Sequence, residues 1–414
     1  MSGVRVRWGP SCAVSEVRCM SPRSNAAQAG CPAWDRGPRL CIEPLRRHTR
    51  MTLGDWVALA MLWWRGGGRP AIVRWLVEPR GAGRMGAGCR ATLETVVSAI
   101  DPGLAASGRL ARARAPAQGA LEAAHAGGIT AVPWSDTRYP TALAAIADPP
   151  PVLWIRGDPE ALRAPTVAIV GSRAGSAYAR DVGRELGSGL ARCGVTVVSG
   201  LARGVDSAAH RGALAVDGRT VGVLGSGVDI MDPPEHSGLA RDVMRRGALV
   251  SELPLGTTPR PAYFPQRNRL ISGLSRAVVV VEASTRSGSL ITARLALEQG
   301  REVMAVPGNV LTGRNRGAHA LLKDGAKVVE DVADILEEIG LVGTRVTNTR
   351  ADELVSKDPV LRHLSRGESY DLDDLVALSG LDGPRLLPRL LELELAGRVA
   401  RRDGGRFHRT DGGG

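Results

Sequence analysis

Short apolar segments rich in valine recur six times between residues 166 and 308, and this repetition constrains the fold more than any other feature of the chain. Stretches with helical spacing separate most of them, as at 177–192, 205–216 and 289–299. Buried strands that alternate with helices are typical of a doubly wound, mostly parallel sheet, so the sequence predicts an α/β fold. In such a sheet, ligands bind beyond the carboxyl ends of the strands. The six segments are TVAIVG (166–171), VTVVSG (195–200), TVGVLG (220–225), ALVSEL (248–253), AVVVVEA (277–283) and EVMAVPG (302–308).

The segment before this region predicts smaller units. Residues 1–50 mix arginine, proline, glycine and cysteine without a sustained period, and we expect a disordered extension or an overcalled start. Residues 51–130 predict a small helical region, with helices over 52–64, 91–100 and 119–126. Three prolines at 149–151 predict a rigid connector into an edge strand over 152–155, within an α/β domain that we place at 131–342.

The C-terminal part has a different pattern. Residues 343–357 form a polar linker, and residues 358–410 predict three short helices followed by a two-stranded hairpin, which is the pattern of a winged helix. The segment is neutral in charge, so contact with a protein is at least as well supported as contact with DNA. We expect the helices at 360–364, 372–379 and 383–395, and the strands at 398–401 and 406–408.

The charge balance gives a weak indication of the partner. Basic residues outnumber acidic ones by 54 to 42, a net charge of +12, but half of this excess lies in residues 1–50. The six cysteines include no CxxC pair, which argues against a zinc site. No apolar run reaches the ~18 residues of a membrane-spanning helix, and the N-terminal residues lack the pattern of a signal peptide. We therefore expect a soluble cytoplasmic protein without a metal site or a cofactor.

Glycine and arginine meet at the carboxyl ends of the first two predicted strands. The first strand ends in Gly171-Ser172-Arg173, and the second ends in Ser199-Gly200, shortly before Arg203-Gly204. A glycine there lets backbone N–H groups approach a phosphate, a helix start carries partial positive charge, and an arginine binds two oxygens at once. An ordinary tight turn explains the first loop equally well.

Two polar residues after the second strand have simpler interpretations. Asp206 is better explained as a helix cap or a partner of Arg203 than as a catalytic base. His210 has no cysteine or second histidine at metal-binding spacing, so we expect a structural hydrogen-bonding role.

The adjacent aromatics Tyr263 and Phe264 stand between prolines and arginines after the fourth strand. An aromatic ring that stacks a base, beside arginines that bind the flanking phosphates, is the arrangement that binds single-stranded nucleic acid. We expect one ring to be buried and the other to be available. The alternative is that a ring fills the core while the arginines are solvated or ion-paired. The polar candidates here are Arg267, Asn268 and Arg269.

A further loop, Ser287-Gly288-Ser289, opens the helix after the fifth strand. Backbone donors and hydroxyls at a helix start suit an oxyanion, although plain N-capping explains the same residues. No serine–histidine–acid set, paired catalytic carboxylates or metal ligands occur at the predicted strand ends. The sequence therefore favours a binding protein over an enzyme.

The chain resembles the DprA/Smf family, the DNA processing protein A family, through a series of motifs in family order over roughly residues 130–340. One departure concerns Asp232-Pro233, where family members usually have Tyr-Pro, and we leave that loop out of the site. The region before residue 130 also matches poorly. The motifs are VAIVGSR, VVSGLARGVDSAAH, VGVLGSGVD, LVSELPLG, FPQRNRLISGLS, VVVEASTRSGSLITARLALEQGREVMAVPG and HALLKDGA.

The resemblance implies a Rossmann-like domain that binds and protects single-stranded DNA, forms a homodimer, and loads the recombinase RecA during natural transformation and DNA recombination. It places the DNA at 171–173, at 199–200 with 203–204, and at 264–269. A second hypothesis is a nucleotide-cleaving phosphoribohydrolase of the lysine-decarboxylase-like type, which carries a PGGxGTxxE motif. Residues 285–292 lack its double glycine and its glutamate, so binding is the better hypothesis.

Overall fold

The computed structural model describes residues 51–65, 92–100, 108–341, 358–365, 368–401 and 405–410. The predicted extension at 1–50 and the predicted linker at 343–357 lie outside the described residues.

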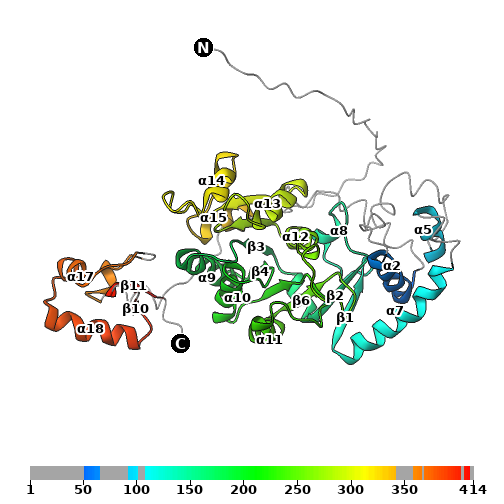
Figure 1. Cartoon of the computed structure of the whole chain (residues 1–414), viewed down its shortest axis with the longest axis horizontal. Coiled ribbons are helices and arrows are strands. Elements are labelled where there is room, and N and C mark those ends of the chain that lie inside the picture. The colour runs from blue at the N-terminus through cyan, green and yellow to red at the C-terminus, as the bar shows by residue number, and fades with distance from the viewer. Residues whose placement is uncertain are drawn as a thin grey trace, which may run out of the picture. The chain divides into compact units, whose positions relative to one another are not determined.

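A nine-stranded sheet forms the centre of the α/β domain, with strand order β1-β2-β6-β5-β4-β3-β7-β8-β9 (Figure 1). All neighbours from β6 to β9 pair in parallel, whereas β2 pairs antiparallel with both β1 and β6. The predicted doubly wound, mostly parallel fold is confirmed. The strands are β1 (Ile129–Pro133), β2 (Val152–Gly157), β3 (Thr166–Val170), β4 (Thr196–Ser199), β5 (Thr220–Val223), β6 (Ala248–Ser251), β7 (Ala277–Val280), β8 (Glu302–Ala305) and β9 (Lys327–Val328).

Strand β2 corrects one prediction, because it is not an edge strand. It lies between β1 and β6, and Ile155 faces Thr130 on one side and Val250 on the other. Residues 152–155 are all buried, as expected of a strand in a sheet that is covered on both faces. The edge is β1, which begins beside the predicted boundary at residue 130.

Both faces of the sheet are covered, because successive side chains of each strand point to opposite sides. On β3, Val167 and Ile169 belong to one core cluster, while Ala168 and Val170 belong to another. The predicted helices at 177–192, 205–216 and 289–299 are confirmed within one residue. The helices of this domain are α8 (Thr141–Ala144), α9 (Ala177–Arg192), α10 (Val205–Ala215), α11 (Ser237–Arg246), α12 (Tyr263–Leu274), α13 (Ser289–Glu298), α14 (Arg316–Lys323) and α15 (Val332–Glu338), with short 3₁₀ turns at Pro159–Leu162 and Pro234–His236.

Three helices precede the sheet: α2 (Leu53–Arg65), α5 (Leu93–Ile100) and α7 (Arg109–Ala126). The buried rings of Trp56 in α2 and Trp134 after β1 lie 6.4 Å apart, which joins this region to the sheet. Helix α7 begins ten residues before the predicted start at 119, because small alanines throughout 111–124 supply its buried face.

The C-terminal residues form a separate core of their own around Leu375, Leu390 and Phe407. The predicted helices at 372–379 and 383–395 are α17 (Leu372–Ser379) and α18 (Gly383–Leu395). The expected helix at 360–364 is a single 3₁₀ turn, Leu361–His363, and the hairpin is β10 (Val399–Arg401) with β11 (Phe407–Arg409). Within the described residues, no helix combines the length and the apolar character needed to span a membrane.

Candidate functional site

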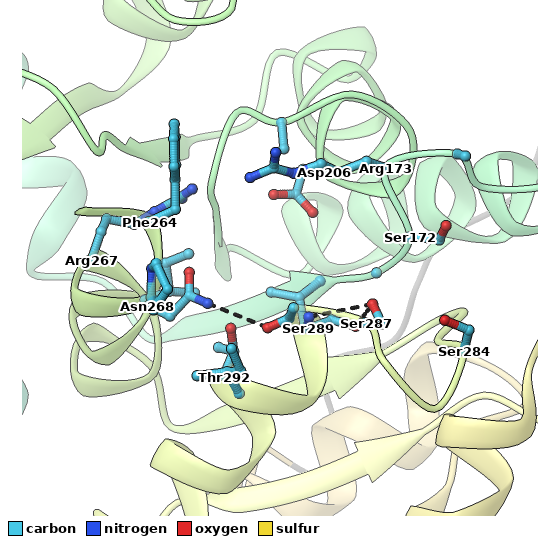
Figure 2. Close-up of a pocket in the computed structure, with 18 of the residues that line it drawn as sticks. Ser172, Arg173, Asp206, Phe264, Arg267, Asn268, Ser284, Ser287, Ser289 and Thr292 are labelled. Carbon is cyan, nitrogen blue, oxygen red and sulfur yellow. Dashed lines mark hydrogen bonds between the residues drawn. The ribbon is translucent and has the colours of Figure 1, made fainter. Parts of the chain in front are cut away.

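A pocket of about 600 Å³ opens at the carboxyl end of β3 (Figure 2). Nine of the fourteen residues singled out from the sequence line this pocket, so most of its wall comes from the predicted loops. The lining residues include Gly171, Ser172, Arg173, Ala202, Asp206, Phe264, Arg267, Asn268, Ser284, Ser287, Gly288, Ser289, Ile291 and Thr292.

Three helices begin at this pocket. Asp206 lies in the first turn of α10, Phe264 and Arg267 lie in the first two turns of α12, and Ser289 is the first residue of α13. The positive end of the helix dipole favours an anion at such positions. The convergence of three helix starts therefore makes the pocket suitable for a phosphate.

The structure does not support the alternative in which Ser287 or Ser289 is the N-cap of α13. The N-cap residue is Gly288, which makes no side-chain cap. The hydroxyls of Ser287 and Ser289 instead hydrogen-bond each other at 2.7 Å. The Ser289 N–H donates a long, 3.4 Å bond to the Ser287 hydroxyl, and Asn268 Nδ2 donates to the Gly288 carbonyl at 3.3 Å. These contacts fix the loop against α12 and leave both hydroxyls at the pocket wall.

Arg173 and Phe264 form one wall of the pocket. The Arg173 guanidinium carbon lies 5.1 Å from the centroid of the Phe264 ring, a cation–π contact. The ring packs on Gly225, where an added Cβ would lie 3.0 Å from Phe264 Cδ1. Arg173 is exposed, so its charge faces both the solvent and the pocket.

The expectation for the two aromatics is wrong in part, because both rings are half-buried. Tyr263 packs edge-on against Trp64 of α2, with ring centroids 5.6 Å apart, and does not line the pocket. Phe264 is therefore the aromatic residue of the site.

Arg267 lies in the floor of the pocket and is only 5% exposed. Its Nη1 donates to the Val223 carbonyl at 2.9 Å, and its Nε has no hydrogen-bond partner among the described residues. Burial lowers the pKa of Arg267 to about 10, which still leaves it charged at neutral pH. Gly200 packs directly against this guanidinium, and a Cβ there would lie 2.0 Å from Arg267 Nη1.

Asp206 is the buried carboxylate of the site. Its Oδ2 accepts a 3.0 Å hydrogen bond from the Gly200 N–H, so it fixes the loop after β4 rather than orienting Arg203. Burial raises the pKa of Asp206, and the nearby charge of Arg267 opposes that rise.

Five of the predicted site residues do not line the pocket: Arg269, and four residues of the loop after β4, Ser199, Gly200, Arg203 and Gly204. The Ser199 hydroxyl is buried and donates to the Ile169 carbonyl at 2.6 Å, and Arg203 forms a surface ion pair with Glu235. This loop instead contributes Ala202 to the wall. Its glycines serve the backbone: Gly204 has φ +77°, a conformation that side-chain-bearing residues rarely adopt.

The expectation that Arg269 contacts phosphate is also corrected. Arg269 is 6% exposed and pairs with Glu252 and, at 3.1 Å, with Asp148. Residues two positions apart lie on nearly opposite sides of a helix, so Arg267 and Arg269 of α12 point into different environments.

His210 has the structural role expected of it. Its Nδ1 lies 2.7 Å from the Thr220 hydroxyl, which donates to the Val197 carbonyl, so the ring donates through Nδ1. Burial lowers the pKa of His210 to about 3, so the ring is neutral at neutral pH. No cluster of metal-ligating side chains occurs in the part of the chain that the structure describes.

Ser284, Ile291 and Thr292 also line the pocket and were not among the fourteen predicted site residues. Thr292 follows Ser289 by three residues, one helical turn, and this spacing was the available signal.

Comparisons with known proteins match both parts of the chain. A sequence model of the family described as DNA recombination-mediator protein A matches residues 130–353, and a model of the DprA winged helix domain matches residues 350–405. Protein Smf of Escherichia coli is 42% identical over 283 residues, which cover 66% of this chain and 76% of that protein. DNA processing protein DprA of Bacillus subtilis is 43% identical over 213 residues, 51% of this chain and 72% of that protein.

A solved structure agrees with these matches. The X-ray structure of DNA processing protein A from Streptococcus pneumoniae covers 65% of this chain and 92% of that chain, with a TM-score of 0.57 and 34% sequence identity. The residues that form the pocket all lie within the range matched by the first family model.

Proposed function

The chain belongs to the DprA/Smf family of DNA recombination-mediator proteins, and from this premise we propose that it binds single-stranded DNA in the pocket beside Arg173 and Phe264. The observation that carries the proposal is the exposed Arg173 guanidinium beside the half-buried Phe264 ring, at a pocket where three helices begin.

The chemistry of this wall supports a nucleotide as the ligand. The arginine and the helix starts suit the phosphate, and the aromatic ring suits a base, since stacking on an aromatic side chain contributes ~1–3 kcal/mol per base. A volume of about 600 Å³ is that of a small-ligand site. A paired base stays within its duplex and cannot enter such a site, so the proposal favours single strands.

The family assignment supports the wider role. Relatives are named as DNA processing proteins, and the family description is that of a recombination mediator. We accordingly propose that the chain protects incoming single strands and loads the recombinase RecA on them, as a homodimer in the cytoplasm, during natural transformation.

We further propose that the chain is not an enzyme. Asp206 is the single carboxylate among the described residues that line the pocket, and it is hydrogen-bonded to Gly200. The competing phosphoribohydrolase hypothesis requires release of free base from nucleoside monophosphates. Chromatography after incubation with these compounds tests it, and release above the level of heat-inactivated protein would support the enzyme.

The direct test of binding compares one sequence as a single strand and as a duplex. We expect fluorescence anisotropy to show tighter binding of the single strand by the full chain. Equal affinity for the two forms, or tighter binding of the duplex, would contradict the proposal.

A further inference from the structure

The loop of residues 307–315, between β8 and α14, presents two aliphatic side chains to the solvent. Val310 is 72% exposed and Leu311 is 91% exposed. Exposing neighbouring large apolar side chains is unfavourable, and such patches commonly mark interaction sites.

The backbone of this loop is held in place by its own hydrogen bonds. The Asn309 side chain accepts a 2.8 Å bond from the Leu311 N–H, and the Thr312 hydroxyl donates to the Asn309 carbonyl at 3.2 Å. At the end of the loop, Asn315 is 3% exposed and its Nδ2 donates to the Val306 carbonyl at 3.0 Å. The exposure of the two side chains is therefore built into the fold of the loop.

The loop lies next to the rim of the pocket at two points. Arg314 Nη1 donates to the carbonyl of Ala174 at 3.2 Å, and Ala174 lines the pocket. Gly317, which follows the loop, packs on Ser284, since a Cβ there would lie 2.5 Å from the Ser284 carbonyl oxygen. In Figure 2, Ser284 and Ser172 lie on the side of the pocket opposite Phe264. The 307–315 loop therefore adjoins this side of the pocket.

The surrounding charge favours one kind of partner. The three segments that meet here, 171–180, 284–294 and 307–317, contain six arginines and no aspartate or glutamate. Just outside them, Glu298 pairs with Arg294, and Glu282 accepts hydrogen bonds from Ser176, so five of the arginines have no partner among the described ion pairs. A polyanion suits this edge better than an apolar protein surface does. Aliphatic side chains on DNA-binding proteins pack against or between base pairs as wedges, whereas aromatic rings are the usual platforms for unpaired bases.

We propose that Val310 and Leu311 form an apolar wedge that packs on the terminal base pair of a duplex adjoining the bound single strand. The chain then recognises junctions between single- and double-stranded DNA, with the single-stranded arm in the pocket. This inference rests on the proposed function, because the pocket must hold the single strand for the wedge to reach the duplex.

The test uses the full chain and two kinds of DNA: a thymidine oligonucleotide, and the same oligonucleotide continued into a hairpin duplex at its 5′ or its 3′ end. We expect one junction polarity to bind about tenfold more tightly than the oligonucleotide alone, equivalent to ~1.4 kcal/mol. The double variant Val310→Ser with Leu311→Ser loses this preference and keeps the affinity for the oligonucleotide. Leu395→Ser, at an 82% exposed leucine of the winged helix, is the matched control and keeps the preference.

The possible failures are distinguishable. Equal binding of junction and oligonucleotide by the parent chain, or an unchanged preference in the double variant, overturns the wedge while single-strand binding stands. A change in oligomeric state on light scattering, without a change in junction binding, assigns the loop to a protein interface and also overturns the wedge. Absence of binding to either DNA overturns the proposed function itself.

Discussion

Replacing Arg173 by alanine perturbs the proposed DNA site with little cost to the fold. The side chain is exposed, and its described contact is the 5.1 Å approach to the Phe264 ring. Its removal leaves no buried group unpaired, so we expect the free energy of unfolding to change by less than ~0.5 kcal/mol. The effect on DNA binding then reports the loss of one positive charge at the pocket.

The size of that effect depends on salt in a defined way. Each phosphate contact on a single strand contributes about −0.7 to the slope of log affinity against log salt concentration. Loss of one contact therefore lowers the affinity roughly eightfold at about 50 mM salt and roughly threefold at about 200 mM salt. A salt titration followed by fluorescence anisotropy of a labelled thymidine oligonucleotide measures both the affinity and the slope.

Arg245→Ala is the matched control, since it removes the same charge from an exposed arginine on α11 that does not line the pocket. We expect it to bind with the slope of the parent chain. If Arg173→Ala and the parent gave the same slope and the same affinity across the titration, Arg173 would not contact phosphate and the site would be placed wrongly.

Three further predictions address the ring, the backbone and the buried histidine. Phe264→Ala should lower single-strand affinity by ~1–3 kcal/mol with an unchanged salt slope, because a stacking ring carries no charge; anisotropy measures it, and a changed slope would argue against stacking. Gly204→Ala should lower the free energy of unfolding in urea by about 2–3 kcal/mol, since the new Cβ would lie 2.3 Å from the Ser172 carbonyl oxygen. Gly119→Ala in α7, where nothing lies within 4 Å, should instead raise it by ~0.5–1 kcal/mol, and equal effects would refute the steric argument. The pKa of His210 is about 3 in the folded chain and 6.5 in the unfolded chain. As the pH falls below 6.5, the unfolded chain therefore binds a proton at His210 that the folded chain does not bind. The free energy of unfolding is unaffected above pH 6.5 and declines by up to ~1.4 kcal/mol per pH unit toward pH 3. His210→Asn should remove this component from urea denaturation curves recorded across that range, and an identical pH dependence in both proteins would contradict the assignment.

The strands and helices of the sheet were predictable because their signals are local. Valine runs that end in glycine identified β3, β4 and β5, and regular apolar spacing gave α9 its observed limits. The position of β2 was not predictable in this way, since its second neighbour, β6, lies far from it in the sequence.

The composition of the site followed from the motifs, but the role of each side chain did not. Arg267 and Arg269 are the same residue type in the sequence, and they differ only in their placement on opposite sides of α12. Arg267 lines the pocket, whereas Arg269 forms a buried ion pair with Glu252. Tyr263 and Phe264 were equally good candidates from the sequence. They differ in the structure because Trp64, which is distant in the sequence, packs against Tyr263. The sequence also did not predict the start of α12, because Pro261 and Pro265 on either side of it are typical of a loop.

The site of DNA contact is tested most directly by photocrosslinking. A thymidine oligonucleotide with one iodouracil in place of thymine is bound to the full chain, irradiated and digested, and the crosslinked peptides are identified by mass spectrometry. We expect crosslinks in the peptides that carry Arg173 and Phe264, and these crosslinks disappear when unlabelled single strand is added in excess. Crosslinks confined to the winged helix, residues 371–409, would contradict this expectation.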